Sequence, residues 1–254
     1  MTAVSYDYPY RLRFSHHGRA EIRVERKGRR IVFDPVERPT PDDLVVLTGP
    51  AADRQRGVVE ALRAGVRPTV IAPGSLREML SKEGPMEGYS TPIELDGVRF
   101  ASLGYVPSPS RPGDALRLPL AAGPLTALRA FSERVRQPEA EPHIMQLTFP
   151  DGTRLLHLDL SLHRETTAEW VEQAREHYAS PDWLIVGCPY GERAAVQKWL
   201  PRFSPARTLV AELVNTERKS LGLPTELVTP LRDQLVGLGL EVHVFAPQSG
   251  YRFE

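Results

Sequence analysis

The chain has 254 residues, enough to bury one large hydrophobic core or two modest ones. Hydrophobic residues make up 41% of it and charged residues 25%, which is typical of a globular protein. The formal net charge is zero, which excludes a general electrostatic attraction to nucleic acid, anionic membranes or acidic substrates.

The first part of the chain is predicted to be a β-hairpin followed by alternating strands and helices. Apolar and charged residues alternate between Arg11 and Phe33, as in half-buried strands, and Lys27-Gly28 marks a turn. The elements predicted next are a strand at Leu44–Leu47, a helix from Asp53, a strand at Pro68–Ala72, a helix at Ser75–Lys82 and a hairpin at Thr91–Tyr105 that turns at Asp96-Gly97.

A segment rich in Pro, Gly and Ser, Val106–Pro124, interrupts this pattern. It predicts a long surface loop, which either borders a functional site as a lid, mediates an oligomer contact or is an insertion remote from the site. A helix is expected after it, at Leu125–Val135. Residues 1–254 are predicted to form a single domain that includes this loop.

The second part of the chain repeats the theme of a hairpin followed by alternating elements. Pro150-Asp151-Gly152 is a strong turn signal between two β-like stretches. The elements predicted are strands at His143–Phe149 and Thr153–Leu160, a helix at Thr167–Tyr178, a strand at Trp183–Gly187, a helix at Glu192–Leu200, a strand at Thr208–Val214, a helix at Glu226–Leu238 and a strand at Glu241–Phe245. Two such halves predict an α/β fold with two sheets covered by helices on their outer faces, a four-layer αββα sandwich.

Several segments, in this order, resemble the metallo-β-lactamase superfamily over nearly the whole chain. The segments are Phe14–Gly18, the hairpin arm Ile31–Pro35, the strand that ends at Thr48, Leu155–Asp159 and Thr208–Leu213. The resemblance is greatest to the branch of ascorbate-6-phosphate lactonase-like proteins. It implies the αββα fold of a binuclear zinc hydrolase.

The first metal-binding loop of that family is degenerate in this chain. Family members carry Thr-His-x-His-x-Asp-His here, whereas this chain has Gly49, Ala51 and Arg54 at the three histidine positions and agrees only at Asp53. Gly and Ala have no donor atoms for a metal, and Arg is a permanent cation that repels one. Asp53 lies where a helix is expected to start, so we interpret it as a helix cap rather than a ligand.

The remaining family ligands are also incomplete. Asp159 matches the Asp that bridges the two metals, Glu212 stands where the last His is expected, and the third His has no counterpart. Carboxylates alone suit Mg²⁺ or Mn²⁺ better than zinc. We expect Arg54 to pair with Asp159 or Glu212 and to fill the former metal cavity, in a cleft that Thr48, Asp53, Arg54, Asp159 and Glu212 line.

A displaced metal site is the alternative. Its candidate ligands for zinc or another divalent metal are His16, His17, His157, Asp159 and His163. His157 is expected on the same strand face as Asp159, two residues away. Histidines in such places are usually structural residues with hydrogen-bonded rings.

The sequence therefore favours a metallo-β-lactamase-fold protein that has lost the standard zinc ligands and that binds a ligand or partner without hydrolysis. The alternative is a metal-dependent hydrolase with a non-standard metal site. No cofactor is expected, and the possible partners are a small anionic ligand bound by Arg54 or a second copy of the chain. Nucleic-acid binding is disfavoured, because the basic segment Arg26–Arg30 has no interleaved aromatic residues.

The cellular compartment is suggested by three absences in the sequence. Cys188 is the single cysteine, so no intrachain disulfide forms, and it is expected to be a buried structural thiol. Neither a signal-peptide pattern nor an apolar run long enough to span a membrane is present. We expect a cytoplasmic protein without membrane contact.

Overall fold

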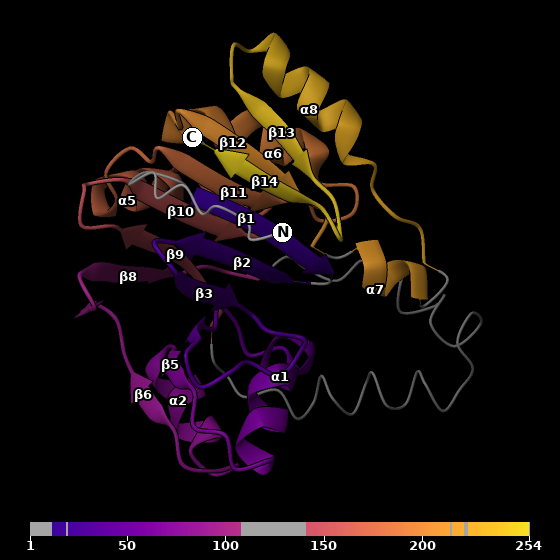
Figure 1. Cartoon of the computed structure of the whole chain (residues 1–254). Helices are drawn as coiled ribbons and strands as arrows, with labels where there is room; N and C mark the ends of the chain where they lie inside the picture. The colour runs from indigo at the N-terminus through magenta and orange to yellow at the C-terminus, as the bar shows by residue number, and fades with distance from the viewer. Residues whose placement is uncertain (1–11, 19, 108–140, 214, 221–222, 254) are drawn as a thin grey trace, which may run out of the picture.

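The strands of the chain form two sheets. The computed structural model describes residues 12–18, 20–107, 141–213, 215–220 and 223–253, and it contains two seven-stranded sheets. Figure 1 shows the strands between the helices of the first half, α1 and α2, and those of the second half, such as α6 and α8. The predicted αββα layering is confirmed.

The first sheet starts with antiparallel strands and continues with parallel ones. Lys27 and Gly28 both have positive φ, of 48° and 76°, as a two-residue hairpin turn requires. From β3 onward the strands run parallel, so their C-terminal ends lie at the same edge of the sheet. In spatial order the strands are β14 (Gly250–Phe253), β1 (Leu12–Gly18), β2 (Glu21–Arg26), β3 (Arg29–Phe33), β4 (Leu44–Val46), β5 (Thr69–Ile71) and β6 (Glu87–Tyr89).

The second sheet has the same mixed character. Strands β10 to β13 are parallel, whereas β7, β8 and β9 pair antiparallel. In spatial order the strands are β13 (Val242–Phe245), β12 (Arg207–Ala211), β11 (Trp183–Gly187), β10 (Arg154–Asp159), β9 (His143–Thr148), β8 (Val98–Gly104) and β7 (Ile93–Leu95).

Three hydrophobic clusters hold the layers together. The central cluster lies between the two sheets and contains Phe14, Phe33, Met145 and Phe245, all fully buried. One outer cluster packs helices on the first sheet, and the other packs helices on the second. The helices are α1 (Ala52–Arg63) and α2 (Gly74–Leu80) on the first sheet, and α5 (Ala168–His177), α6 (Arg193–Trp199), the 3-10 turn η1 (Leu200–Phe203), α7 (Asn215–Ser220) and α8 (Val228–Gly237) in the second half.

The sequence missed some short elements and misplaced a boundary. Strands β6 and β14 and helix α7 were not predicted, and β12 ends at Ala211 rather than Val214. The interpretation of Asp53 as a helix cap is wrong, because α1 begins at Ala52 and its N-cap is Ala51. The helix expected at Leu125–Val135 lies outside the described residues. Among the described residues, no helix is long and apolar enough to cross a membrane.

Candidate functional site

Five buried side chains meet where strands from both sheets end, and we call them the Arg54 cluster: Asp34, Thr48, Arg54, Tyr105 and Asp159. Asp34 directly follows β3 and Thr48 lies two residues beyond β4. Arg54 is in the first turn of α1, Tyr105 directly follows β8, and Asp159 is the last residue of β10. The cluster therefore joins the edge of one sheet to the edge of the other.

The Arg54 guanidinium donates to three side chains of the cluster. Its Nη1 lies 2.6 Å from Asp159 Oδ2 and its Nη2 lies 2.8 Å from Asp159 Oδ1, which is the two-point geometry of a strong Arg–carboxylate pair. Nη1 also lies 3.1 Å from Asp34 Oδ2 and 2.7 Å from Thr48 Oγ1. Both terminal nitrogens of Arg54 are thus occupied by groups of the chain itself.

Local backbone conformation and neighbouring donors hold the two carboxylates in place. Asp34 accepts hydrogen bonds from the Thr48 backbone N–H at 2.8 Å and from the Thr48 hydroxyl at 2.5 Å. The Tyr105 hydroxyl donates to Asp159 Oδ2. Asp34 and Asp159 have positive φ, of 43° and 52°, a left-handed conformation that is uncommon for residues other than Gly and that clusters at functional sites.

The charges of the cluster balance as one cation and one anion. Burial alone raises the pKa of Asp159, but the charge and hydrogen bonds of Arg54 outweigh it and hold that pKa below its ordinary value. For Asp34, burial dominates and raises the pKa to about 7, with Asp159 adding to the rise and Arg54 opposing it. Burial, reinforced by the charge of Asp159, raises the pKa of Tyr105 well above its ordinary value, so this hydroxyl keeps its proton.

With Arg54 in place, the Arg54 cluster does not form a zinc site. A hydrolytic zinc site needs about three protein ligands and an open position, whereas the cluster offers two carboxylates that already accept from Arg54. In the preceding loop, Gly49 lies against the Arg54 stem: a Cβ built on it would be 3.5 Å from Arg54 Cδ. The Arg54 side chain occupies the space between this loop and the carboxylates.

A second group of potential ligands lies on the outer face of the first sheet. His17, Glu21 and Glu37 form the only set of three or more His, Cys, Asp or Glu side chains in the described part of the chain whose ligand atoms all lie within 4.8 Å of one another. Arg23 lies between the two acids, with Nη2 2.5 Å from Glu21 Oε1 and 2.7 Å from Glu37 Oε2. The other oxygen of Glu21 accepts from the backbone N–H groups of Val36 and Glu37, at 2.7 and 3.0 Å. Arg23 therefore pairs with both carboxylates of this group and offsets one of their two charges.

In the part of the chain that the structure describes, the histidines proposed for a displaced metal site form no cluster of ligand atoms with Asp159. The ring of His16 packs 5.3 Å from the ring of Phe245, and burial lowers its pKa to about 4. His163 Nε2 lies 2.8 Å from the Val106 carbonyl oxygen, and its Nδ1 accepts from the Glu165 N–H at 3.3 Å. The His163 ring thus has a contact at each nitrogen, as is expected of a structural residue.

His157 is different, because its buried ring has no hydrogen-bond partner among the described residues at either nitrogen. It stacks on Phe33 with a centroid distance of 4.8 Å between the sheets. Burial lowers its pKa to about 4, with the Arg54 charge acting in the same direction and the Asp159 charge opposing it. The imidazole is therefore neutral near pH 7.

The other predicted cleft residues lie at the same edge but contribute less. Glu212 follows β12, two strands from Asp159 in the second sheet, and its backbone N–H donates to the Phe245 carbonyl at 3.2 Å. Of the two ion pairs expected for Arg54, the structure contains that with Asp159. Asp53 lies in α1, and its side chain is outside the described residues, as are residues 108–124 of the Pro-rich loop. The lid prediction stays a prediction.

Two members of the cluster were missed at the level of the sequence. Asp34 follows the hairpin strand that ends at Phe33. An acidic residue at the end of a buried strand is a signal by which it could have been predicted. Tyr105 gave no signal, because its contact with Asp159 spans 54 residues.

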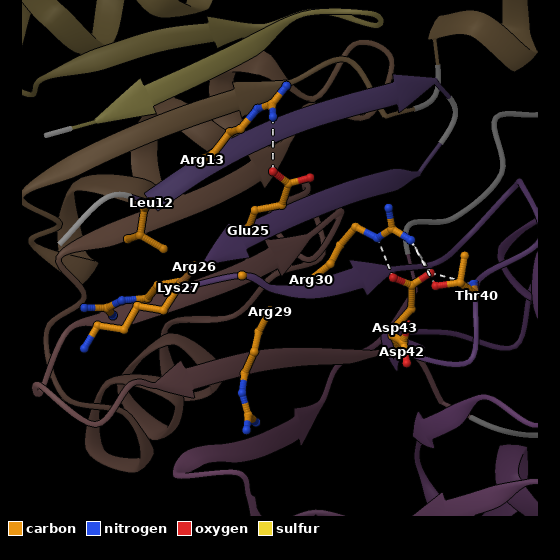
Figure 2. A pocket seen from close by; sticks show the side chains of 11 residues that line it. Leu12, Arg13, Glu25, Arg26, Lys27, Arg29, Arg30, Thr40, Asp42 and Asp43 are labelled. Carbon is orange, nitrogen blue, oxygen red and sulfur yellow. Dashed lines mark hydrogen bonds and ion pairs between the residues drawn. The ribbon is translucent and has the colours of Figure 1, made fainter. Parts of the chain in front are cut away.

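An open hollow of about 500 Å³ lies over the hairpin β2–β3, away from the Arg54 cluster. Figure 2 shows Arg13 against Glu25 and Arg30 against Asp43, and these residues form a row of alternating charges across neighbouring strands. Because the charges are paired along this row, this part of the hollow is an ionic surface of alternating sign.

Comparison with known proteins places the fold. No protein-family model and no curated protein matches the sequence. Among solved structures, Igni18, a metallo hydrolase from the hyperthermophilic archaeon Ignicoccus hospitalis, is similar with a TM-score of 0.66 and 16% identity, over 96% of this chain and 99% of its own. A possible metal-dependent hydrolase from Veillonella parvula has a TM-score of 0.59 and 13% identity, over 95% and 99%.

A third similar structure is CmlA, a diiron beta-hydroxylase from Streptomyces venezuelae, with a TM-score of 0.63 and 10% identity over 97% of this chain. This chain spans only 55% of the length of CmlA. At such identities the likeness shows the fold alone. The comparisons agree with the predicted αββα layering, and proteins that share this fold include metal-dependent hydrolases.

Proposed function

We propose that this chain uses the metallo-β-lactamase-like fold without hydrolytic metal chemistry and acts by binding a partner. The observation that supports this most directly is the position of Arg54 Nη1, which contacts oxygens of Asp34, Thr48 and Asp159 at 2.6–3.1 Å. A permanent cation already pairs with both acidic side chains at the strand ends. No group is then available there to lower the pKa of a bound water.

The pairing of Arg54 with Asp159 also favours a macromolecular partner over a small anionic ligand. A small anion at Arg54 has to compete with Asp159, a buried carboxylate that contacts the guanidinium at two points and belongs to the same chain. An intramolecular partner has a large entropic advantage over a free one. We therefore favour a macromolecular partner, including a second copy of this chain, over a small anionic ligand at Arg54.

The experiment combines metal analysis with activity. The full chain is purified without chelator, its zinc, iron and manganese contents are measured, and ester, lactone, thioester and phosphodiester hydrolysis is assayed with each metal added. We expect no stoichiometric metal and no metal-dependent turnover. Light scattering on the same sample reports whether the chain self-associates.

The competing function is a metal-dependent hydrolase with non-standard ligands. Proteins that share the fold keep this alternative open. One or two metal ions per chain, with turnover that disappears on chelation and in Asp159→Asn, would establish it and refute the proposal.

A further inference from the structure

We propose that Asp34 and Asp159 form a cation-binding site whose cation, the Arg54 guanidinium, is supplied by the chain itself, and that a free cation binds there once this side chain is shortened. The inference rests on the proposed function, since both place Arg54 where a metal ion would be needed. It adds a ligand class to the site, namely small hard cations and guanidinium.

The first support is the geometry around Nη1 of Arg54. Three oxygens surround this atom, Asp159 Oδ2 at 2.6 Å, Thr48 Oγ1 at 2.7 Å and Asp34 Oδ2 at 3.1 Å. They come from the ends of β10, β4 and β3, which belong to two different sheets. Convergent oxygens from separate strand ends around one positive charge are the arrangement of a cation site.

The second support is burial. The side chains of Asp34 and Asp159 are both 0% exposed, so water does not solvate their charge. A buried carboxylate without a counter-charge is strongly unfavourable. Shortening Arg54 therefore leaves a space lined by oxygen atoms and an unbalanced negative charge, which a diffusible cation can compensate.

The third support concerns which cations the site accepts. Carboxylate and hydroxyl oxygens are the ligands that Mg²⁺ and Mn²⁺ prefer, and the cluster supplies no imidazole or thiolate contact to Arg54. The guanidinium ion reproduces the native donors directly. Mn²⁺ and guanidinium are therefore the probes of choice.

The test uses thermal melts of the full-length Arg54→Ala variant with Mn²⁺ or with millimolar guanidinium, far below denaturing concentrations. We expect at least one of the two to raise its Tm saturably, by roughly 3–6 °C at a tenfold excess over Kd. The wild type and Arg56→Ala, an exposed arginine of the same helix, serve as matched controls and are expected to show no rise. A melting temperature of Arg54→Ala that responds to neither cation would overturn the proposal.

A double variant covers the case in which Arg54→Ala does not fold. Arg54→Ala/Asp159→Asn removes the cation together with the charge that it balances. A folded double variant without a cation response supports the proposal, and an unfolded one contradicts it. These melts test only the cation site. The proposed function is tested separately, by the metal content and turnover of the wild type.

Discussion

The Arg54 guanidinium meets the Asp159 carboxylate in a two-point contact, with Nη1–Oδ2 and Nη2–Oδ1 distances of 2.6 and 2.8 Å. Arg54 lies on α1, which covers the first sheet, whereas Asp159 ends β10 of the second. The contact therefore connects the two layers of the sandwich by an ion pair rather than by apolar packing. The planar guanidinium suits this role better than an ammonium group, because it offers two parallel donors.

Replacing Arg54 with Ala is expected to destabilise the protein by about 3–5 kcal/mol, because it leaves buried carboxylates without their partner. The control is Arg56→Ala, which removes an exposed pair with Glu60 in the next turn of α1. The free energy of unfolding of this variant is expected to change by no more than about 0.5 kcal/mol. Urea denaturation of both variants measures the difference, and equal stabilities would contradict the structural role of Arg54.

The regular parts of the fold were predictable because they carry local signals. The turn residues Lys27-Gly28 and Asp96-Gly97 both adopt positive φ in the structure, as hairpin turns require. Strand β14 carried no comparable signal, since its pairing with β1 joins the two ends of the chain. A short strand that pairs with a segment so distant in the sequence shows no periodic pattern by which it can be predicted.

The candidate site was only partly predictable for the same reason. Thr48, Arg54 and Asp159 stand at strand ends or beside them, where the order of elements indicates a shared edge. Asp34 belongs to the cluster because it accepts hydrogen bonds from Thr48, which is 14 residues away. A local sequence pattern gives no indication of this contact. The interpretation of Asp53 as a helix cap was wrong because the N-cap is Ala51, two residues before the acid.

Tyr105→Phe tests how much the hydrogen bond from the Tyr105 hydroxyl to Asp159 contributes to stability. The variant removes a hydrogen bond to a buried charge, so we expect a loss of about 1.5–3 kcal/mol in the free energy of unfolding. Tyr178→Phe is the matched control, because this buried hydroxyl makes only long contacts, 3.4 Å to the Ile144 carbonyl and 3.5 Å to that of Ala101. Chemical denaturation of both variants should show the larger loss for Tyr105→Phe, and the reverse order would be inconsistent with a charged Asp159.

Asp34→Asn is expected to change the pH dependence of stability. The pKa of Asp34 is raised from 3.8 to about 7 in the folded state, so the folded chain keeps a proton that the unfolded chain loses between these values. The resulting stabilisation is complete below pH 3.8 and disappears as the pH rises to about 7. Asn does not titrate and loses no such stabilisation. As the pH rises through this window, the variant should therefore gain stability relative to the wild type by up to about 1.4 kcal/mol per pH unit.

Urea midpoints of both proteins across this pH range give the difference. Because the titrations of Asp34 and Asp159 are coupled to each other, the slope belongs to the pair of carboxyl groups rather than to a single one. A stability difference that stays constant with pH would mean that the folded state holds no extra proton at Asp34.

His157→Leu is expected to reduce the acid sensitivity of the protein. The pKa of His157 is lowered from 6.5 to about 4 by burial, so the folded ring stays neutral while the unfolded ring takes a proton. Its contribution to stability is present above pH 6.5 and is lost as the pH falls towards 4. Relative to the wild type, the variant should therefore gain about 2 kcal/mol between about pH 7.5 and about pH 5.

Phe33→Leu provides the control for this effect. It removes the ring that stacks on His157 at 4.8 Å but leaves the titrating group in place, so its cost should arise from packing and vary little with pH. Some acid sensitivity should remain in His157→Leu, because burial lowers the pKa of His16 to about 4 as well. If His157→Leu and the wild type lose stability in parallel as the pH falls, the buried ring is already protonated in the folded state or hydrogen-bonded in a way that its surroundings do not show.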